Sequence, residues 1–220
     1  MTELFKIGLE TGDFSEFTSH YGTQTVVTSP VHHGTYALQT AASSSASSKG
    51  TTDETTEKWL YFNYRFSRLL TGSQEIVFVG CSDGVDSQWN LTYVGPGELG
   101  ICQIAVYKSS APTFEVKWWI PEGDFDPNVD HAIKIRHKSG SGNAEIDLYV
   151  DDMETPKLQI TNVTFNTPTT YSFGDLDSAG GGNYTGWHDC IAGNTVEPND
   201  PFTAPVASVV CDTTVTIGSG

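Results

Sequence analysis

The chain has 220 residues, of which only 17% are charged, and it carries a formal net charge of −16 with a sequence pI near 4.5. A chain of this length suits one large β domain with a sizeable core. An acidic surface repels phosphate backbones and anionic lipids, and no apolar run approaches the ~20 residues that a membrane-spanning helix needs. These properties argue against nucleic acid as a partner and against insertion into a membrane.

Short β-prone segments separated by turns recur along the whole chain, and no window of helix length sustains a 3.6-residue period. The expected strands, in chain order, are 4–9, 24–28, 35–40, 59–67, 74–80, 87–94, 101–107, 114–120, 131–138, 144–151, 157–164, 170–174 and 185–192. The polar, Ser- and Thr-rich segment 41–57 is expected to be a solvated loop. The pattern predicts an all-β fold.

Alternation along the expected strand 59–67 separates its two faces. The residues expected in the core are Leu60, Phe62, Tyr64 and Phe66. The residues expected on the opposite face are Trp59, Tyr61, Asn63 and Arg65. Such alternation is typical of an antiparallel sheet with one wet face.

The start of the chain, residues 5–17, runs from an apolar strand into the acidic turn Glu10-Thr11-Gly12-Asp13, which is followed by an aromatic-flanked serine. Further strand motifs follow in order at 29–38, 59–67, 144–152 and 184–194. Together these motifs resemble the concanavalin A-like modules of polysaccharide lyases, carbohydrate-binding modules and phage surface proteins. Two positions depart from the family pattern, since Asp152 replaces the usual glycine and Cys190 a common second aspartate.

The resemblance implies a jelly-roll β-sandwich of two antiparallel sheets over residues 1–195, with its first and last strands paired. Residues 196–220 then form a C-terminal extension, which begins with a Pro-containing break and includes a β-prone stretch at 206–217. A lone strand is unstable in water, so we expect this stretch to be an added edge strand or an arm that pairs with another subunit.

The resemblance also implies a structural Ca²⁺ ion between the first and last strands. Its ligands would be Glu10 of the opening motif and Asp189 of the closing motif, supplemented by Asp13 or main-chain carbonyl groups. Calcium takes 6–8 oxygen ligands, which carboxylates near turns can supply. The alternative is that Glu10 and Asp13 only cap the turn.

A glycan-binding surface is expected on the non-core side of one sheet. Its residues would be Trp59, Tyr61, Asn63, Arg65, Gln103, Lys117 and Trp119. Flat aromatic rings stack on sugar faces, while amides and cations bind hydroxyl or acidic groups. The alternative is that loops or a partner subunit cover these aromatic side chains.

The catalytic patterns of enzymes with this fold are incomplete. Glu145 and Asp147 resemble the E-x-D-x-E strand of laminarinase-like hydrolases, but Tyr149 stands in the third acidic position. Gln103-Ile104-Ala105 lacks the histidine of the Q-I-H strand of alginate lyases. Arg65, Tyr61 or Tyr107 would have to replace it as acid, base or charge neutraliser. We therefore expect no catalytic residues.

Four cysteines are present, at positions 81, 102, 190 and 211, without the C-x-x-C spacing of a zinc site. Two disulfides (81–102 and 190–211) and four buried free thiols are both compatible with the sequence. The first residues lack the basic and apolar regions of a signal peptide, so either a leader was removed or release follows another route, such as lysis.

The sequence thus predicts a non-catalytic binding or structural module on a virion surface or outside the cell. A capsid-decoration or tail-associated protein is the preferred interpretation. A carbohydrate-binding module of a secreted enzyme and a polysaccharide lyase are the alternatives.

Overall fold

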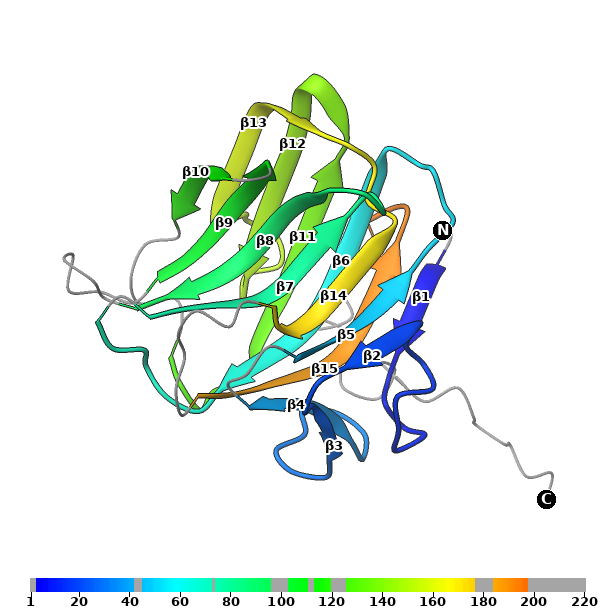
Figure 1. The fold of residues 1–220 in the computed structure, drawn as a ribbon, viewed down its shortest axis with the longest axis vertical. Helices are drawn as coiled ribbons and strands as arrows, with labels where there is room; N and C mark the ends of the chain where they lie inside the picture. The colour runs from blue at the N-terminus through cyan, green and yellow to red at the C-terminus, as the bar shows by residue number, and fades with distance from the viewer. Residues whose placement is uncertain are drawn as a thin grey trace.

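The computed structural model describes residues 3–41, 45–72, 74–95, 103–110, 113–119, 126–176 and 184–197. In these ranges the chain forms two antiparallel sheets and no helix, so none of the described residues belongs to a helix able to cross a membrane. The sheets lie face to face (Figure 1). The expected all-β, jelly-roll sandwich is confirmed.

Sheet A contains eight strands, seven of which follow one another side by side. Their order is β13 (Leu158–Phe165), β12 (Gly140–Val150), β11 (His131–Lys138), β6 (Glu57–Phe66), β15 (Thr185–Asn194), β4 (Ala37–Ala41) and β3 (Thr25–Val27). The eighth, β1 (Glu3–Ile7), pairs with β15.

Sheet B contains seven strands. Their order is β10 (Thr113–Trp119), β9 (Gln103–Ser110), β8 (Ser87–Val94), β7 (Glu75–Ser82), β14 (Thr170–Asp175), β5 (Ser45–Gly50) and β2 (Ser19–Tyr21). The side chains of 103, 107, 109, 110 and 113–119 lie outside the described part of the structure.

The first and last strands of the sandwich are adjacent, as expected. In the β1–β15 ladder, Phe5 lies opposite Gly193 and Ile7 opposite Ile191. β4 pairs with residues 185–188 of β15 and β1 with residues 191–194, so the two short strands share one edge of β15. Cys190, between them, has a positive φ of 50°, and the β6 ladder shifts register there, which marks a β-bulge.

The core fills the space between the inner faces of the two sheets. The alternation predicted for β6 is confirmed, because Leu60, Phe62, Tyr64 and Phe66 are all buried in this core. The rings of Tyr64 from sheet A and Phe78 from sheet B stack with centroids 4.4 Å apart. Such contacts between large apolar groups supply most of the driving force for folding.

One expected loop is in part a strand. Residues 45–50, in the polar segment 41–57, form β5, which pairs with β14 on one side and β2 on the other. Ser45, Ala46 and Ser47 are buried rather than solvated, and Ser47 Oγ donates a hydrogen bond of 2.7 Å to Gln24 Oε1. Serine fits this buried position because its hydroxyl group is satisfied inside the protein.

Cys81 and Cys190 are buried thiols that form no disulfide, so of the two alternatives that the sequence left open the thiols hold at these two positions. Cys102 and Cys211 lie outside the described residues. The strand expected at 206–217, and with it most of the extension at 196–220, also lies outside them.

Candidate functional site

The residues expected to form one glycan-binding face lie in different sheets. Trp59, Tyr61, Asn63 and Arg65 belong to β6 of sheet A, whereas Gln103 belongs to β9 and Lys117 and Trp119 to β10 of sheet B. The prediction of one continuous surface is therefore wrong. Alternation fixes the face of a strand but not the sheet that the strand joins.

Two of the predicted aromatic residues are buried on the outer side of sheet A. Trp59 is 4% exposed and Tyr61 is 1% exposed, and both pack with Tyr149 and Met153. Lys134 Nζ lies 3.9 Å from the centroid of the Tyr149 ring and 5.3 Å from that of Trp59. These cation–π contacts and the close packing leave no aromatic platform for a sugar at this point.

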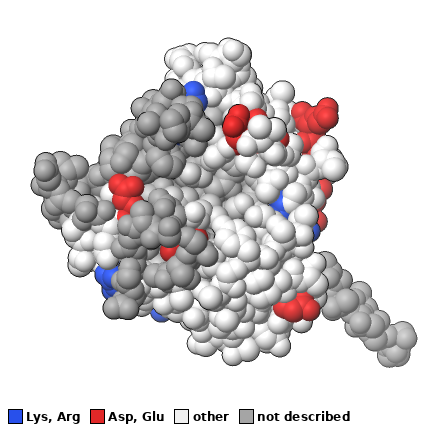
Figure 2. Space-filling view, viewed as in Figure 1, with Lys and Arg blue, Asp and Glu red and all other residues white. Residues whose placement is uncertain are grey.

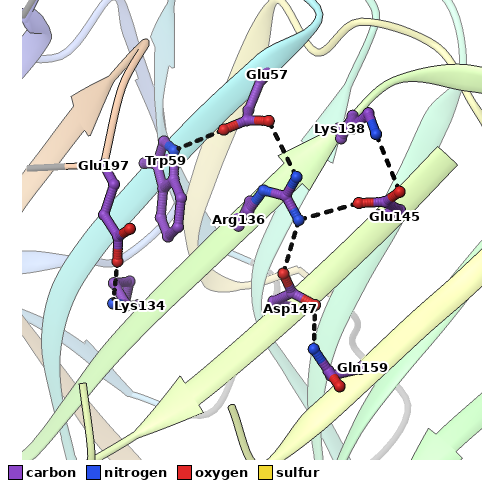
Figure 3. Close-up of polar contacts among 9 residues, drawn as sticks. All are labelled: Glu57, Trp59, Lys134, Arg136, Lys138, Glu145, Asp147, Gln159 and Glu197. Carbon is purple, nitrogen blue, oxygen red and sulfur yellow. Dashed lines mark hydrogen bonds and ion pairs between the residues drawn. The ribbon is translucent and has the colours of Figure 1, made fainter. Parts of the chain in front are cut away.

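Lys134 also fixes the chain around this aromatic cluster. Its ammonium group donates a hydrogen bond to the main-chain oxygen of Met153. It donates another, over 2.8 Å, to Glu197 Oε1 (Figure 3). The loop after β12 and the segment after β15 are thereby tied to the outer face of sheet A. This covering is the alternative that the sequence left open for Trp59 and Tyr61.

Beside this cluster, one guanidinium group binds three carboxylates (Figure 3). Arg136 Nη2 lies 3.1 Å from Glu57, and its Nη1 lies 3.0 Å from Glu145 and 2.9 Å from Asp147. Burial opposes the charge of Arg136, but its hydrogen bonds to Glu57 and Asp147 outweigh this effect and raise its pKa. The hydrogen bond from Lys138 lowers the pKa of Glu145.

This network does not provide the chemistry of a glycosidase. Such an enzyme needs one carboxyl group that stays protonated to serve as the acid, which requires a raised pKa. Glu145 has a lowered pKa, and Asp147 is held by the same guanidinium. The two carboxylates are ion-pair partners of Arg136.

The residues suggested for lyase chemistry are not assembled either. Arg65 lies in sheet A, Tyr107 lies in β9 of sheet B, and Tyr61 is buried. The outer face of sheet B carries, in its described part, the small uncharged residues Asn90, Thr92 and Ser172 as well as Glu75. In the view of Figure 2, acidic and basic side chains form separate spots around a largely uncharged surface.

A small polar hollow, which we call the notch, lies on the outer side of sheet A next to the buried aromatic cluster. Its cavity volume is about 10 Å³, roughly what one water molecule or one hydroxyl group occupies. It is lined by Pro30, His32, Ala37, Asn63, Tyr64, Arg65, Asp130, Trp187 and Asp189. Two of the predicted glycan-binding residues, Asn63 and Arg65, thus belong to it.

The strand register brings the polar walls of the notch together. On neighbouring strands β6 and β15, Asn63 lies opposite Asp189 and Arg65 lies opposite Trp187. Asn63 is 2% exposed, and among the described residues neither atom of its side-chain amide has a hydrogen-bond partner; the same holds for the Nε of Arg65. Most buried polar atoms in proteins have a partner, so these atoms leave hydrogen-bonding capacity that a water molecule or a ligand group can use.

Asp130 closes the notch from the segment before β11. Its Oδ2 lies 3.9 Å from Arg65 Nη1 and 3.8 Å from His32 Nδ1. Both distances exceed a direct hydrogen bond, but an oxygen atom beside the line that joins the two groups can bridge them. Trp187 forms another wall, and its indole Nε1 donates a hydrogen bond of 3.2 Å to Gln39 Oε1, which fixes the ring.

His32, Asp130 and Trp187 were not predicted as site residues. A usable signal existed for Trp187, since alternation in 185–194 puts Trp187 and Asp189 on the face opposite the buried His188. His32 and Asp130 come from connecting segments whose position no periodic pattern reveals.

The proposed calcium ligands Glu10 and Asp189 both hold the loop that contains residues 32–35. Glu10 Oε1 accepts the Thr35 N–H at 2.9 Å. Asp189 Oδ2 accepts the N–H groups of His32 at 2.8 Å and His33 at 3.0 Å. Burial raises the pKa of Asp189, and these hydrogen bonds oppose the rise.

Asp13 instead stabilises its own turn, where its Oδ1 accepts hydrogen bonds from the Thr11 hydroxyl and the Ser15 N–H, both at 2.9 Å. Within the described ranges, no three His, Cys, Asp or Glu side chains come close enough to hold a metal ion. Two carboxylates against one loop fit a calcium ion only if main-chain carbonyl groups complete its shell. Calcium remains a prediction.

Comparison with known proteins gives structural likeness without sequence likeness. No protein-family model and no curated protein sequence matches the chain. The cellulose-induced protein Cip1 is 14% identical, with a TM-score of 0.64 over 87% of this chain and 97% of that one. At this identity, the similarity between the two chains shows a shared fold.

Two viral proteins also resemble this chain in fold at low sequence identity. A carbohydrate esterase of the Shiga toxin-encoding bacteriophage phi24B is 15% identical, with a TM-score of 0.64 over 89% of this chain and 99% of that one. Alginate lyase vAL-1 from Chlorella virus is 8% identical, with a TM-score of 0.60 over 89% and 100% of the two chains. These neighbours include enzymes, so fold alone does not decide activity.

Proposed function

We propose that this protein is a non-catalytic surface module that contacts glycans through the notch. The observation that carries the proposal is the unpaired, buried amide of Asn63 beside the fixed ring of Trp187. Aromatic rings with a few well-placed polar groups are what a sugar-binding surface requires. The structural neighbours that act on carbohydrates support this proposal at the level of the fold.

The absence of an assembled acid–base pair among the described side chains supports a binding role over catalysis. Glu145 and Asp147 are ion-paired with Arg136, and Arg65 and Tyr107 lie in different sheets. General acid–base catalysis needs the reacting groups within hydrogen-bond reach of one substrate.

We place this module on a virion surface, as a capsid-decoration or tail-associated protein, or otherwise outside the cell. The full-length likeness to two viral proteins of this fold supports this location. Residues 206–217 would contact another subunit of the same or a different virion protein. The carbohydrate-binding module of a secreted enzyme is the alternative setting for the same binding role.

A glycan array combined with native mass spectrometry and product assays tests the proposal. We expect glycan binding and neither unsaturated products nor new reducing ends from alginate, glucuronan, laminarin or heparin. Turnover abolished by Arg65→Ala would replace the proposal with a polysaccharide lyase. Absence of binding to every displayed glycan would overturn it.

A further inference from the structure

We infer that the notch accepts a single hydroxyl group of a neutral sugar, whose ring rests against Trp187. The inference rests on the proposed function and names the ligand class of that same site. It follows from three properties of the notch: the hydrogen-bonding capacity of its walls, its charge and its size.

The walls offer both donors and acceptors to one small group. The Asn63 amide has an unpaired donor and an unpaired acceptor, and both are buried. The unpaired Nε of Arg65 adds a donor and the carboxylate of Asp130 adds an acceptor. A hydroxyl group donates one hydrogen bond and accepts up to two, so it can satisfy both kinds of group at once.

Charge in the notch disfavours an acidic sugar. The carboxyl groups of Asp130 and Asp189 line it together with one guanidinium, that of Arg65. Asp130 lies 3.9 Å from this guanidinium and offsets its charge, and the whole chain has a formal charge of −16. A uronate or sialate would therefore meet repulsion that a neutral sugar avoids, because specificity often depends on such unfavourable contacts.

Size limits how much of the ligand the notch encloses. A volume of about 10 Å³ admits roughly one oxygen-sized group, so the rest of the sugar stays at the surface, where the partly exposed Trp187 ring offers a stacking face. A contact this small is weak when it acts singly. Avidity rises by about 10²–10⁴ when several linked copies of the module engage several copies of the ligand at once.

The test uses the full chain and its variants on polymers that carry either neutral disaccharides (mannobiose, cellobiose, laminaribiose) or acidic probes (an alginate disaccharide, sialyllactose). Trp187→Ala removes the stacking face and Asp130→Ala removes the acceptor. Tyr21→Ala is the matched control, because Tyr21 is 51% exposed and lies on β2 at the edge of sheet B. Circular dichroism and melting verify the fold of each variant.

We expect wild type and Tyr21→Ala to bind a neutral probe, and Trp187→Ala and Asp130→Ala to lose binding at least about tenfold, which corresponds to 1.4 kcal/mol. Binding of acidic probes alone, lost in both notch variants, would overturn this inference and leave glycan contact through the notch standing. Neutral binding that both notch variants retain would overturn this inference and also the notch as the contact site, and would leave only glycan binding at another surface. Failure of every probe to bind would overturn the function as well. Because Asp130 is an independent, partly exposed position, the test holds even if Trp187→Ala fails to fold.

Discussion

Arg65 Nη1 and Asp130 Oδ2 face each other across 3.9 Å, which is about 1 Å longer than a charge-assisted hydrogen bond. The Asp130 side chain is 31% exposed, so the pair is also screened by solvent. The two groups therefore form an ion pair without a direct hydrogen bond, and an oxygen atom beside the pair can bond to both. Asp130 thus has a modest structural role and, in our account, a larger role in binding.

We expect Asp130→Asn to change the free energy of unfolding by no more than about 0.5 kcal/mol, as is usual for exposed ion pairs. Urea denaturation of wild type and variant measures this change. A loss several times larger would show that the Arg65–Asp130 pair is mainly structural, and binding data on the variant would then need correction for unfolded protein.

Substitution of Trp59 distinguishes the two possible roles of the aromatic residues on β6, which are a buried structural cluster or the glycan-binding surface expected from the sequence. Because its side chain is buried against Tyr149 and Lys134, Trp59→Ala should reduce the free energy of unfolding by about 3–5 kcal/mol. The folded fraction should bind glycans as wild type does, since Trp59 lies outside the notch. Reduced binding by fully folded Trp59→Ala would show that Trp59 takes part in glycan binding, as expected from the sequence.

Stability should fall on mild acidification because two histidines are buried in the neutral form. Burial lowers the pKa of His137 and of His188 to about 3 in each case, from the usual value of about 6.5 for histidine. Below pH 6.5 these two histidines become protonated in the unfolded chain but stay neutral in the folded chain. Each histidine then removes roughly 1.4 kcal/mol of stability per pH unit as the pH falls toward 3.

His131 has the opposite effect on stability, because its contribution is lost as the pH rises above 6.5. Burial lowers its pKa, but hydrogen bonds to Asp151 and to the main-chain oxygen of Asp126 outweigh burial and raise it overall. Its stabilising contribution is complete below pH 6.5 and is lost as the pH rises through the folded-state pKa.

We therefore expect the free energy of unfolding to be greatest near pH 6.5. Urea denaturation from pH 5 to 8 measures the profile. His131→Asn should flatten only the limb above pH 6.5, and a profile without an acid limb would contradict the burial of neutral His137 and His188.

Calcium, if it binds at Glu10 and Asp189, should stabilise the fold. A ligand bound only by the native state at 100 times its dissociation constant adds about 2.7 kcal/mol. EDTA should then lower the melting temperature of wild type but not that of Glu10→Ala. If EDTA has no effect on wild type while Asp189→Ala still melts early, the two carboxylates only hold the 32–35 loop through its N–H groups.

The sequence predicts those features that depend on local periodicity. Alternation correctly placed Phe62 and Tyr64 in the core, and the ordered motifs correctly paired the first and last strands. It could not show that β6 and β10 belong to different sheets, because strand order depends on long-range pairing. The ammonium of Lys134 packed between Trp59 and Tyr149 was equally hidden, since its partners are distant in sequence.

Nuclear magnetic resonance of the labelled side chains tests the central claim, that glycans contact the notch on sheet A, most directly. The indole N–H of Trp187 and the side-chain amide of Asn63 give separate signals, which can be followed while a neutral oligosaccharide is added. We predict that both signals shift in proportion to the bound fraction, while the indole signal of the buried Trp59 stays in place. Shifts confined to residues of the sheet B face, such as Asn90 and Thr92, with Trp187 and Asn63 unchanged, would contradict the account.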